Sequence, residues 1–259
     1  MTAQHQGADL LLRRQRGGIA RLTLNDPDRA NALSMAMIGQ LTKAIGDAAG
    51  DASVAVVVIG AAGRIFCAGH DLAELRATED GAEHRRIFDR CSDLMRAIVD
   101  CPKPVIASVT GAAVAAGCQL VASCDLAYAE ERSRFAVSGI DLGLFCSTPA
   151  VAVSRAIGRK SALEMLFTGR FVTAAEAASI GLINRAVASD ELEGVVDAVA
   201  ASIAAKPPEA VALGKALFNR QIEMDLKEAY GLAGACMAEN LSFPSARSGI
   251  DAFLNRSGR

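Results

Sequence analysis

The sequence has few aromatic residues and little net charge. It contains no Trp and two Tyr among 259 residues, so stacking platforms for nucleobases are scarce. The formal net charge is -2, so no positive field draws nucleic acid or an anionic membrane to the protein. We therefore expect neither nucleic acid nor a membrane as a partner.

Long apolar runs and disulfide-type cysteine spacing are missing too. The seven cysteines form no C-x-x-C pair and are odd in number, which favours reduced thiols in a cytosol over a disulfide framework. The first nine residues are polar, and no run of ~18 apolar residues occurs that would span a membrane. These absences predict a cytoplasmic protein that is neither secreted nor inserted in a membrane.

Several catalytic and binding motifs are also absent. The sequence has no G-x-G-x-x-G, no P-loop and no G-x-S-x-G, so dinucleotide-binding, NTP-binding and elbow-type hydrolase functions lack support. Cys67 and His70 have a metal-like spacing, and Asn240-Leu241-Ser242 matches a glycosylation sequon. Chance accounts for both patterns in a reduced cytosolic protein, and we predict no metal site.

The chain does contain an alternation of strand and helix patterns. Ile19 to Leu24 alternates like a half-exposed strand, and Val54 to Ile59 is a β-branched run typical of a strand covered on both faces. Ser34 is the expected N-cap of the helix between them. The order then repeats in three segments, namely a helix at Gly81 to Val99, a strand at Val105 to Val109 and a helix after Gly117. This alternation predicts an α/β fold with largely parallel strands.

The later part of the chain becomes purely helical. Short strands are expected at 126–129 and 135–137, and helices at 150–157, 161–167 and 174–180. Three helical patterns follow, at 191–205, 208–239 and 245–255, and prolines stand where these helices restart. We therefore predict a core of residues 1–195 and an α-helical C-terminal region of residues 196–259.

Two segments of small residues follow predicted strands. In the first, Ile65 to Leu72, small residues leave the backbone N–H of Ala68 open to a ligand. The second, Gly111 to Gln119, opens a helix whose first N–H groups lack intrahelical partners. A thioester oxygen that gains negative charge would fit such N–H groups. Either segment alone is better explained by close packing of a helix on a sheet.

Taken together, the two segments and their surroundings resemble the enoyl-CoA hydratase/isomerase family, known as crotonases. The resemblance extends from Ile19 to Phe253. Its matching pieces are Leu24 to Leu33, Phe66-Cys67-Ala68-Gly69-His70-Asp71-Leu72, Lys103 to Ala107, Gly111 to Asp125, Gly143-Leu144, Leu166 to Gly169, Ala174 to Ala177 and Gly181-Leu182-Ile183. Within the family, Gln119 to Asp125 and Gly143 to Pro149 look most like the subgroup called enoyl-CoA hydratase domain-containing protein 3.

The resemblance implies a fold and an assembly. The fold is the ClpP/crotonase-like spiral of ββα units, and its α-helical C-terminal region serves in trimerisation. Trimers of the family often pair, so the resemblance implies a homotrimer or a hexamer. The implied ligand is an acyl-CoA of fatty-acid metabolism, with no separate cofactor because coenzyme A enters as part of the thioester.

The resemblance also implies the site residues. The oxyanion donors would be the backbone N–H groups of Ala68 and Ala116. Residues along the coenzyme A path would be Arg29, Ala30, Ala32, Leu33, Ala68, His70, Asp71 and Leu72. Phe253 and Arg256 of a neighbouring subunit resemble the pair that touches the nucleotide end of the ligand. Arginines suit that end because coenzyme A carries phosphate charges.

The two glutamates that hydratases of this family use are both absent. Gln119 stands at the first position and Gly139 at the second. An amide can hold a water molecule but cannot accept its proton near neutral pH, and glycine offers no side chain. Nearby groups that would have to substitute are Asp141, His70, Ser147, Cys118 and Cys146.

Two functional hypotheses follow. One is a hydratase or isomerase of the lyase or isomerase classes, which stabilises a thioester enolate and uses an unrecognised base such as Asp141 or His70. The other is a protein that binds or sequesters acyl-CoA without chemistry. A serine hydrolase is a more remote third, because no Ser-His-Asp order here matches a known triad.

Overall fold

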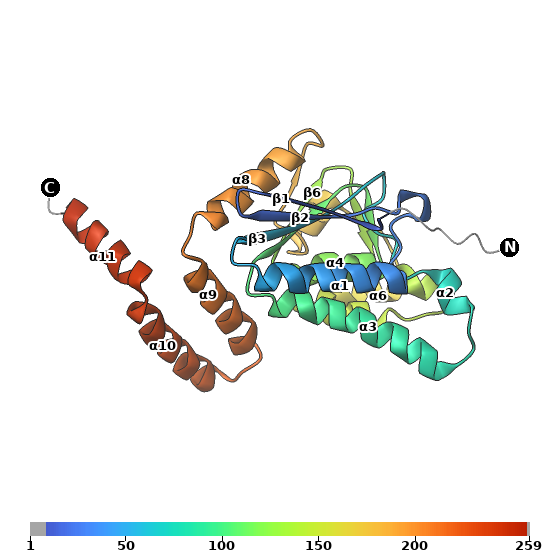
Figure 1. Ribbon diagram of the computed structural model, residues 1–259. Helices are drawn as coiled ribbons and strands as arrows, with labels where there is room; N and C mark the ends of the chain where they lie inside the picture. Colours follow the sequence, from blue (N-terminus) through green and yellow to red (C-terminus); the bar gives the residue numbers. More distant parts are fainter. Residues whose placement is uncertain (1–8, 258–259) are drawn as a thin grey trace.

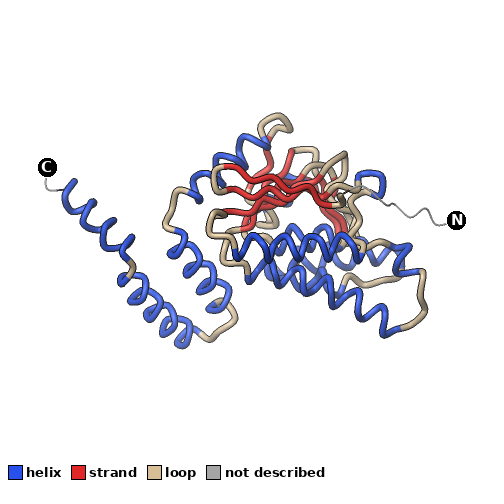
Figure 2. Tube along the Cα trace, in the orientation of Figure 1, coloured by secondary structure: helices blue, strands red, loops and turns tan. Residues whose placement is uncertain are grey.

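The computed structural model describes residues 9–257, with side chains to residue 255. Two sheets form its centre (Figures 1 and 2). The larger has the order β1-β2-β3-β4-β6-β9, and the smaller has the order β5-β7-β8. Their strands are β1 Leu11–Arg16, β2 Ile19–Leu24, β3 Val56–Ala61, β4 Val105–Val109, β5 Ala112–Val114, β6 Leu126–Glu130, β7 Arg134–Ala136, β8 Val172–Thr173 and β9 Arg185–Val187.

The larger sheet is parallel from β2 to β9, and only β1 runs antiparallel to its neighbour. The central strands are apolar on both faces because helices cover both, as the β-branched run of β3 predicts. Parallel pairs need long crossovers, and helices supply them. The predicted α/β fold with largely parallel pairing is therefore confirmed.

Helices surround the sheets, and two short 3-10 helices interrupt the loops. The α-helices are α1 Met35–Gly50, α2 Leu72–Arg76, α3 Gly81–Asp100, α4 Ala116–Ser123, α5 Ser147–Ala156, α6 Arg159–Thr168, α7 Ala174–Ser179, α8 Leu192–Ala204, α9 Pro208–Gln221, α10 Leu226–Ser242 and α11 Pro244–Ser257. The 3-10 helices are η1 Pro27–Arg29 and η2 Ser138–Leu142. Ser34 caps α1 as predicted, since its side chain accepts the Met37 N–H.

The two faces of the larger sheet carry separate cores. The larger core joins the sheet to α1, α3 and α4. The smaller core lies under α8, where Val196 and Ala200 pack on β3 and β4. Figure 1 shows α1 and α3 on one side of the sheet and α8 on the other. The predicted division between residues 195 and 196 lies inside α8, and the two-part organisation stays a prediction.

The structure differs from the expected elements mainly in its short strands and in one long helix. Strands β1, β5, β8 and β9 carry no clear pattern in the sequence, and three of them have only two or three residues. The helix expected at 208–239 is two helices, because residues 222–225 turn before Asp225 caps α10. Short strands form through tertiary pairing rather than through their own periodicity.

Helices α10 and α11 extend away from the sheets, and α9 connects them to the core (Figure 1). In these three helices only Ala229 is buried among the residues with described side chains. None of the helices in residues 9–257 is long and apolar enough to cross a lipid bilayer.

Candidate functional site

The N-terminus of α4 is held in an unusual backbone conformation. Ala115, which precedes the helix, has φ 49 and ψ -115, a region that residues with a Cβ rarely adopt. Its own N–H donates to Ala136 O at 2.8 Å, which fixes it to β7. The following N–H, of Ala116, has no acceptor within residues 9–257. The turn at Ala115 therefore presents the unused Ala116 N–H at the positive end of a helix.

The loop after β3 pairs closely with this helix start. Cys67 N–H donates to Ala112 O at 3.1 Å, and Val114 N–H donates to Cys67 O at 2.9 Å. A Cβ added to Gly117 would lie 2.2 Å from Cys67 O. Only glycine permits this approach, and it brings the two predicted segments into direct contact.

The prediction that Ala68 offers a free N–H is wrong. That N–H donates to Ala30 O at 3.0 Å, so a ligand would have to break an existing hydrogen bond to use it. The next N–H, of Gly69, interacts with the Cys67 thiol. The N–H of His70 has no acceptor among the described residues.

Gly69 places the His70 end of the loop against Ala116. Gly69 has φ 97, and a Cβ built on it would lie 3.2 Å from Ala116 N and 3.0 Å from the Cβ of Ala115. Both unused N–H groups, of His70 and Ala116, therefore flank one point of contact between the loop and α4. Such a pair of amides can bind a developing oxyanion. The role of Ala116 stays a prediction, and His70 replaces Ala68 as the second donor in our proposal.

Asn31 determines the position of the Ala30 carbonyl, which accepts the hydrogen bond from the Ala68 N–H. Its side chain is fully buried, donates to Ala62 O and Ile65 O, and accepts the Asp26 N–H. Ala30 and Asn31 both have positive φ, 53 and 52. The sequence pattern included Asn31 but gave no sign of this role.

The residues expected along the coenzyme A path gather around Asp71. This buried carboxylate accepts the Ala73 and Glu74 N–H groups as the N-cap of α2, and it pairs with Arg29. Arg29 is half exposed and keeps further donors for an anion. Leu33 N–H donates to Gly69 O at 2.8 Å. Ala30 and Ala32 are half-buried, the Leu33 side chain is fully buried, and Leu72 is exposed.

The His70 ring points toward α3, where its edge meets Phe88 at 5.3 Å between centroids. Burial lowers the pKa of His70, and an interaction with the Leu33 main chain that falls short of hydrogen-bond geometry opposes this shift. Neither ring nitrogen has a hydrogen-bond partner among the described residues. The ring is therefore neutral at pH 7 and has unused hydrogen-bonding capacity.

Gln119 lies one turn into α4 and is 3% exposed. Its Oε1 is enclosed and has no hydrogen-bond partner within residues 9–257, a condition that costs ~1–3 kcal/mol if nothing fills it. Gln119 lines a cavity of about 1230 Å³ between α3, α4, α5 and α9. Apolar residues supply much of that lining, among them Met95, Val99, Val151, Phe218 and Ile222.

The position of the second missing glutamate is closed by the main chain. A Cβ on Gly139 would lie 2.6 Å from Leu144 O and 2.8 Å from Cys146 Sγ. Asp141 is exposed in η2, and its carboxylate lies against Gly169, where a Cβ would approach Oδ2 to 2.9 Å. No hydrogen bond or ion pair within the described residues links Asp141 to either unused N–H group.

The other candidate substitutes are poor bases. Burial raises the pKa of Cys118 to about 12 and also raises that of Cys146, so both stay neutral thiols at pH 7. The Ser147 hydroxyl donates to Phe145 O at 3.3 Å and has no base as a partner among the described residues. Proton transfer by these groups is therefore not supported.

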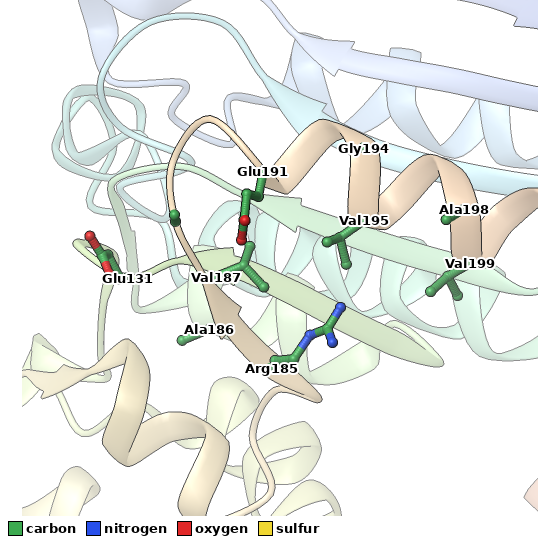
Figure 3. A pocket seen from close by; sticks show the side chains of 10 residues that line it. Glu131, Arg185, Ala186, Val187, Glu191, Gly194, Val195, Ala198 and Val199 are labelled. Atoms are coloured by element: carbon green, nitrogen blue, oxygen red, sulfur yellow. The ribbon is translucent and has the colours of Figure 1, made fainter.

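A second cavity, of about 750 Å³, lies between β9 and α8 (Figure 3). Arg185, Val187 and Val195 line it, and it contains none of the predicted site residues. Within the described residues, no three His, Cys, Asp or Glu side chains are grouped so that they could hold a metal ion.

The two residues expected to reach a neighbouring subunit lie in α11. Phe253 is exposed there. Arg256 belongs to the same helix, but its side chain is outside the described residues.

Comparison with known proteins extends this description. A family profile described as enoyl-CoA hydratase/isomerase matches residues 14–258. "Enoyl-CoA hydratase domain-containing protein 3, mitochondrial" of Rattus norvegicus is 46% identical over 94% of this chain and 81% of its own length. These findings confirm the predicted resemblance to the family and to the subgroup.

Solved structures agree with the fold. The crystal structure of an enoyl-CoA hydratase from Mycobacterium smegmatis has a TM-score of 0.94 and 54% identity, covering 96% of this chain and 97% of the other. That of human enoyl coenzyme A hydratase domain-containing protein 3 has a TM-score of 0.93 and 44% identity, covering 96% and 98%. The predicted crotonase-type fold class is confirmed.

One prediction about the whole protein is contradicted. The relatives from Rattus norvegicus, Danio rerio and Homo sapiens are all named as mitochondrial proteins. The cytoplasmic location expected from the polar N-terminus and the reduced cysteines is therefore wrong, because neither feature separates a cytosolic protein from one in another reducing compartment.

Proposed function

The chain belongs to the enoyl-CoA hydratase/isomerase family, and from this premise we propose that it binds an acyl-CoA thioester at the junction of the Cys67 loop and α4. The N–H groups of His70 and Ala116 hold the thioester carbonyl oxygen and stabilise it when the thioester becomes an enolate. The observation that carries the proposal is the pair of unused amides on either side of the Gly69 contact.

Electrostatics favour this position for an oxygen that gains charge. Ala116 is the first residue of α4, where the helix dipole is positive and N–H groups have no intrahelical acceptors. Contacts at Gly69 and Gly117 fix the amides before a ligand arrives. Donors that are already oriented stabilise charge without a further cost of reorganisation.

The coenzyme A arm would follow the Arg29 to Leu33 segment and the loop from Ala68 to Leu72. Asp71 orients Arg29 through their ion pair, and the guanidinium can pair with a phosphate of the nucleotide end. Phe253 and Arg256 of a neighbouring subunit would complete that end. No separate cofactor is needed, because coenzyme A is part of the bound thioester.

The N–H groups proposed for the thioester carbonyl are present, whereas the two glutamates that would act as acid and base are absent. Gln119 supplies an amide in place of a carboxylate, and Gly139 supplies no side chain and little room for one. Hydration of a 2-enoyl thioester needs both a base and an acid, so hydratase activity is not supported. Binding without chemistry is accordingly the second candidate function, and the closed space at Gly139 favours it.

Binding is tested by calorimetry with butyryl-CoA against free coenzyme A. We expect measurable affinity, stronger for the thioester than for coenzyme A. Arg29→Met should lower the affinity for both ligands about tenfold, because it removes one charge-assisted contact. Exposed Arg85 pairs with Asp89 in α3, so Arg85→Met is the control and should bind normally. No binding at millimolar protein would refute the proposal.

Catalysis is tested separately by incubating the protein with crotonyl-CoA and with longer 2-enoyl and 3-enoyl thioesters. Turnover no faster than in buffer supports binding without chemistry. Turnover that Asp141→Asn or His70→Asn abolishes would instead identify an enzyme with a replaced base.

We also propose that the C-terminal helices assemble the chain into a homotrimer or a pair of trimers. Leu226 is 75% exposed and Tyr230 is 73% exposed in α10, more apolar surface than a helix in water normally carries. Leu142, Leu144 and Phe167 are exposed on the core. Sedimentation of the wild type should give a mass of three or six chains. Met237→Glu in α10 should reduce the number of chains in the assembly. A monomeric wild type would refute this proposal.

A further inference from the structure

Strand β1 is one edge of the larger sheet, and half of its main chain has no partner strand. Leu10 O accepts the Asn25 N–H at 2.7 Å, and alternate residues of an antiparallel strand turn their main-chain groups to opposite sides. The even-numbered residues therefore bond to β2, whereas Leu11, Arg13 and Gln15 turn their N–H and C=O groups outward. No strand among the described residues pairs with that side. Such an edge is a template for an added strand.

The side chains on the α8 side of β1 carry unbalanced positive charge. Arg14 lies directly opposite Arg21 in the β1–β2 register, so the two side chains share one face of the sheet, and Arg16 follows on that face two residues later. Asp197 of α8 pairs with Arg21, whereas Arg14 and Arg16 are exposed and have no ion pair among the described residues. Like charges directly opposite each other destabilise a pair of strands, so carboxylates from another molecule would relieve this repulsion.

The side chains on the other face of β1 already have partners within the chain. Arg13 pairs with Asp47 of α1, and the Gln15 amide donates to the Ser53 hydroxyl at 2.8 Å. Leu12 belongs to the α8 face with the two free arginines and is 38% exposed. An added strand would therefore meet free charge and apolar surface on the α8 face alone.

These features define the strand that fits. A second copy of β1 would bring more arginines against Arg14 and Arg16, so the charge of this edge opposes pairing with itself. A strand antiparallel to β1 would place three alternate residues opposite Arg16, Arg14 and Leu12, in that order along its chain. Glutamate, glutamate and valine are their complements. The residues between these three would lie on the α1 face, where polar side chains suit the neighbouring polar groups.

We propose that β1 is a docking edge for an extended acidic segment of another protein with the sequence pattern Glu-x-Glu-x-Val. The segment adds to the free side of β1 and extends the larger sheet by one strand. Main-chain hydrogen bonds to residues 11, 13 and 15 supply the affinity, and ion pairs with Arg14 and Arg16 set the direction and register. None of the residues proposed for acyl-CoA binding lies in β1, so this inference is independent of that function.

The test measures the fluorescence polarisation of a labelled peptide, Ser-Glu-Thr-Glu-Thr-Val-Ser, as the full chain is added at low salt. We expect binding that weakens as the salt concentration rises, because the ion pairs are exposed. The peptide Ser-Glu-Glu-Thr-Thr-Val-Ser has the same composition and charge but turns one glutamate to the α1 face, so it should bind at least about threefold more weakly. Equal binding of the two peptides would overturn strand addition, because general charge attraction does not depend on residue order. No binding at millimolar protein would overturn it as well.

Hydrogen exchange locates the contact on the sheet. The first peptide should slow the exchange of the Leu11, Arg13 and Gln15 amides, because an added strand accepts hydrogen bonds from them. The amides of β9, the opposite edge of the same sheet, should exchange as before. Protection of β9 in place of β1 would contradict the proposal.

A charge exchange tests the predicted register. Arg14→Glu should lower the affinity for the first peptide about three- to tenfold, and a peptide with lysine in place of its second glutamate should recover that loss. Arg185→Glu is the matched control, since Arg185 is an exposed arginine on the opposite edge strand β9, and it should bind as the wild type does. Unchanged affinity of Arg14→Glu would overturn the assignment. The Tm of each variant reports its folding, and the comparison of the two peptides on the wild type decides the matter even if a variant does not fold.

Discussion

The start of α4 and the C-terminal helices are built in opposite ways. Around α4 the chain is so close to itself that a Cβ on Gly117 would lie 2.2 Å from Cys67 O. In α9 and α10, glycines 214, 231 and 234 have nothing within 4 Å of an added Cβ, and large apolar side chains face outward. The first region is packed tightly within one chain, whereas the second leaves large apolar side chains exposed.

The largest expected effect is at Gly117. Gly117→Ala should lower the free energy of unfolding by ~3 kcal/mol or more, because neither the helix nor the Cys67 carbonyl can move without breaking the strand-like pairing between them. Urea denaturation measures this. Gly214→Ala is the matched change in α9 and should raise stability by ~0.5–1 kcal/mol. Equal effects at both positions would remove the contrast between the two regions.

The second prediction concerns Lys215, which joins α9 to the core. Its side chain is 8% exposed, and its ammonium group donates to Ile98 O, Lys103 O and Asp125. Lys215→Met should cost ~2–3 kcal/mol at pH 7, since Ile98 O and Lys103 O lose this donor and Asp125 keeps the Val105 N–H but loses its counterion. Lys227→Met, an exposed lysine of α10, serves as the control and should be neutral.

The pH dependence of this variant sharpens the test. Burial raises the pKa of Asp125, and Lys215 opposes that increase. A carboxyl whose pKa rises on folding stabilises the fold below its unfolded pKa, and this contribution is lost as pH rises through the folded pKa. Without Lys215 the opposing effect disappears, so the deficit of the variant should be greater at pH 7 than at pH 4. A deficit independent of pH would contradict the ion pair as its cause.

A smaller effect is expected at His70. Burial lowers its pKa, so folding favours the neutral ring. The resulting stability is present above the ordinary pKa of histidine and is lost as pH falls through the folded pKa. The Tm of the wild type should therefore fall between pH 7 and pH 5 by more than the Tm of His70→Leu. Parallel pH profiles of the two Tm values would show that burial does not lower the pKa of the His70 ring.

The smallest effect is expected at Ala115. Its φ of 49 suits glycine, but glycine also increases the freedom of the unfolded chain. Ala115→Gly should therefore change the free energy of unfolding by no more than ~1 kcal/mol, in the stabilising direction. Urea midpoints measure it, and a clear loss of stability would show that the Cβ makes a favourable contact against Gly69.

Much of the fold and part of the site were predictable from the sequence. Apolar periodicity and caps such as Ser34 locate α1, α3 and the central strands, because these elements bury whole faces. The three-residue strands β5 and β9 were not predictable, since pairing partners far along the chain create them.

The error at Ala68 has a similar origin. Which N–H of the Cys67 loop remains free depends on Ala30 O, which arrives from another segment and is held there by Asn31. No pattern within the loop reports that contact. A buried asparagine followed by a helix cap, as in Asn31 to Ser34, is the one signal that could have suggested a structured turn there.

The closed backbone at Gly139 makes a carboxylate much harder to introduce at position 139 than at position 119. At position 119, a change to glutamate exchanges an amide nitrogen for an oxygen and needs no new space. At position 139, any side chain first requires the turn at 144–146 to open, because Leu144 O and Cys146 Sγ occupy its path. An engineer who wants a hydratase from this scaffold must therefore redesign a loop, whereas reactions that use a single carboxylate are one substitution away.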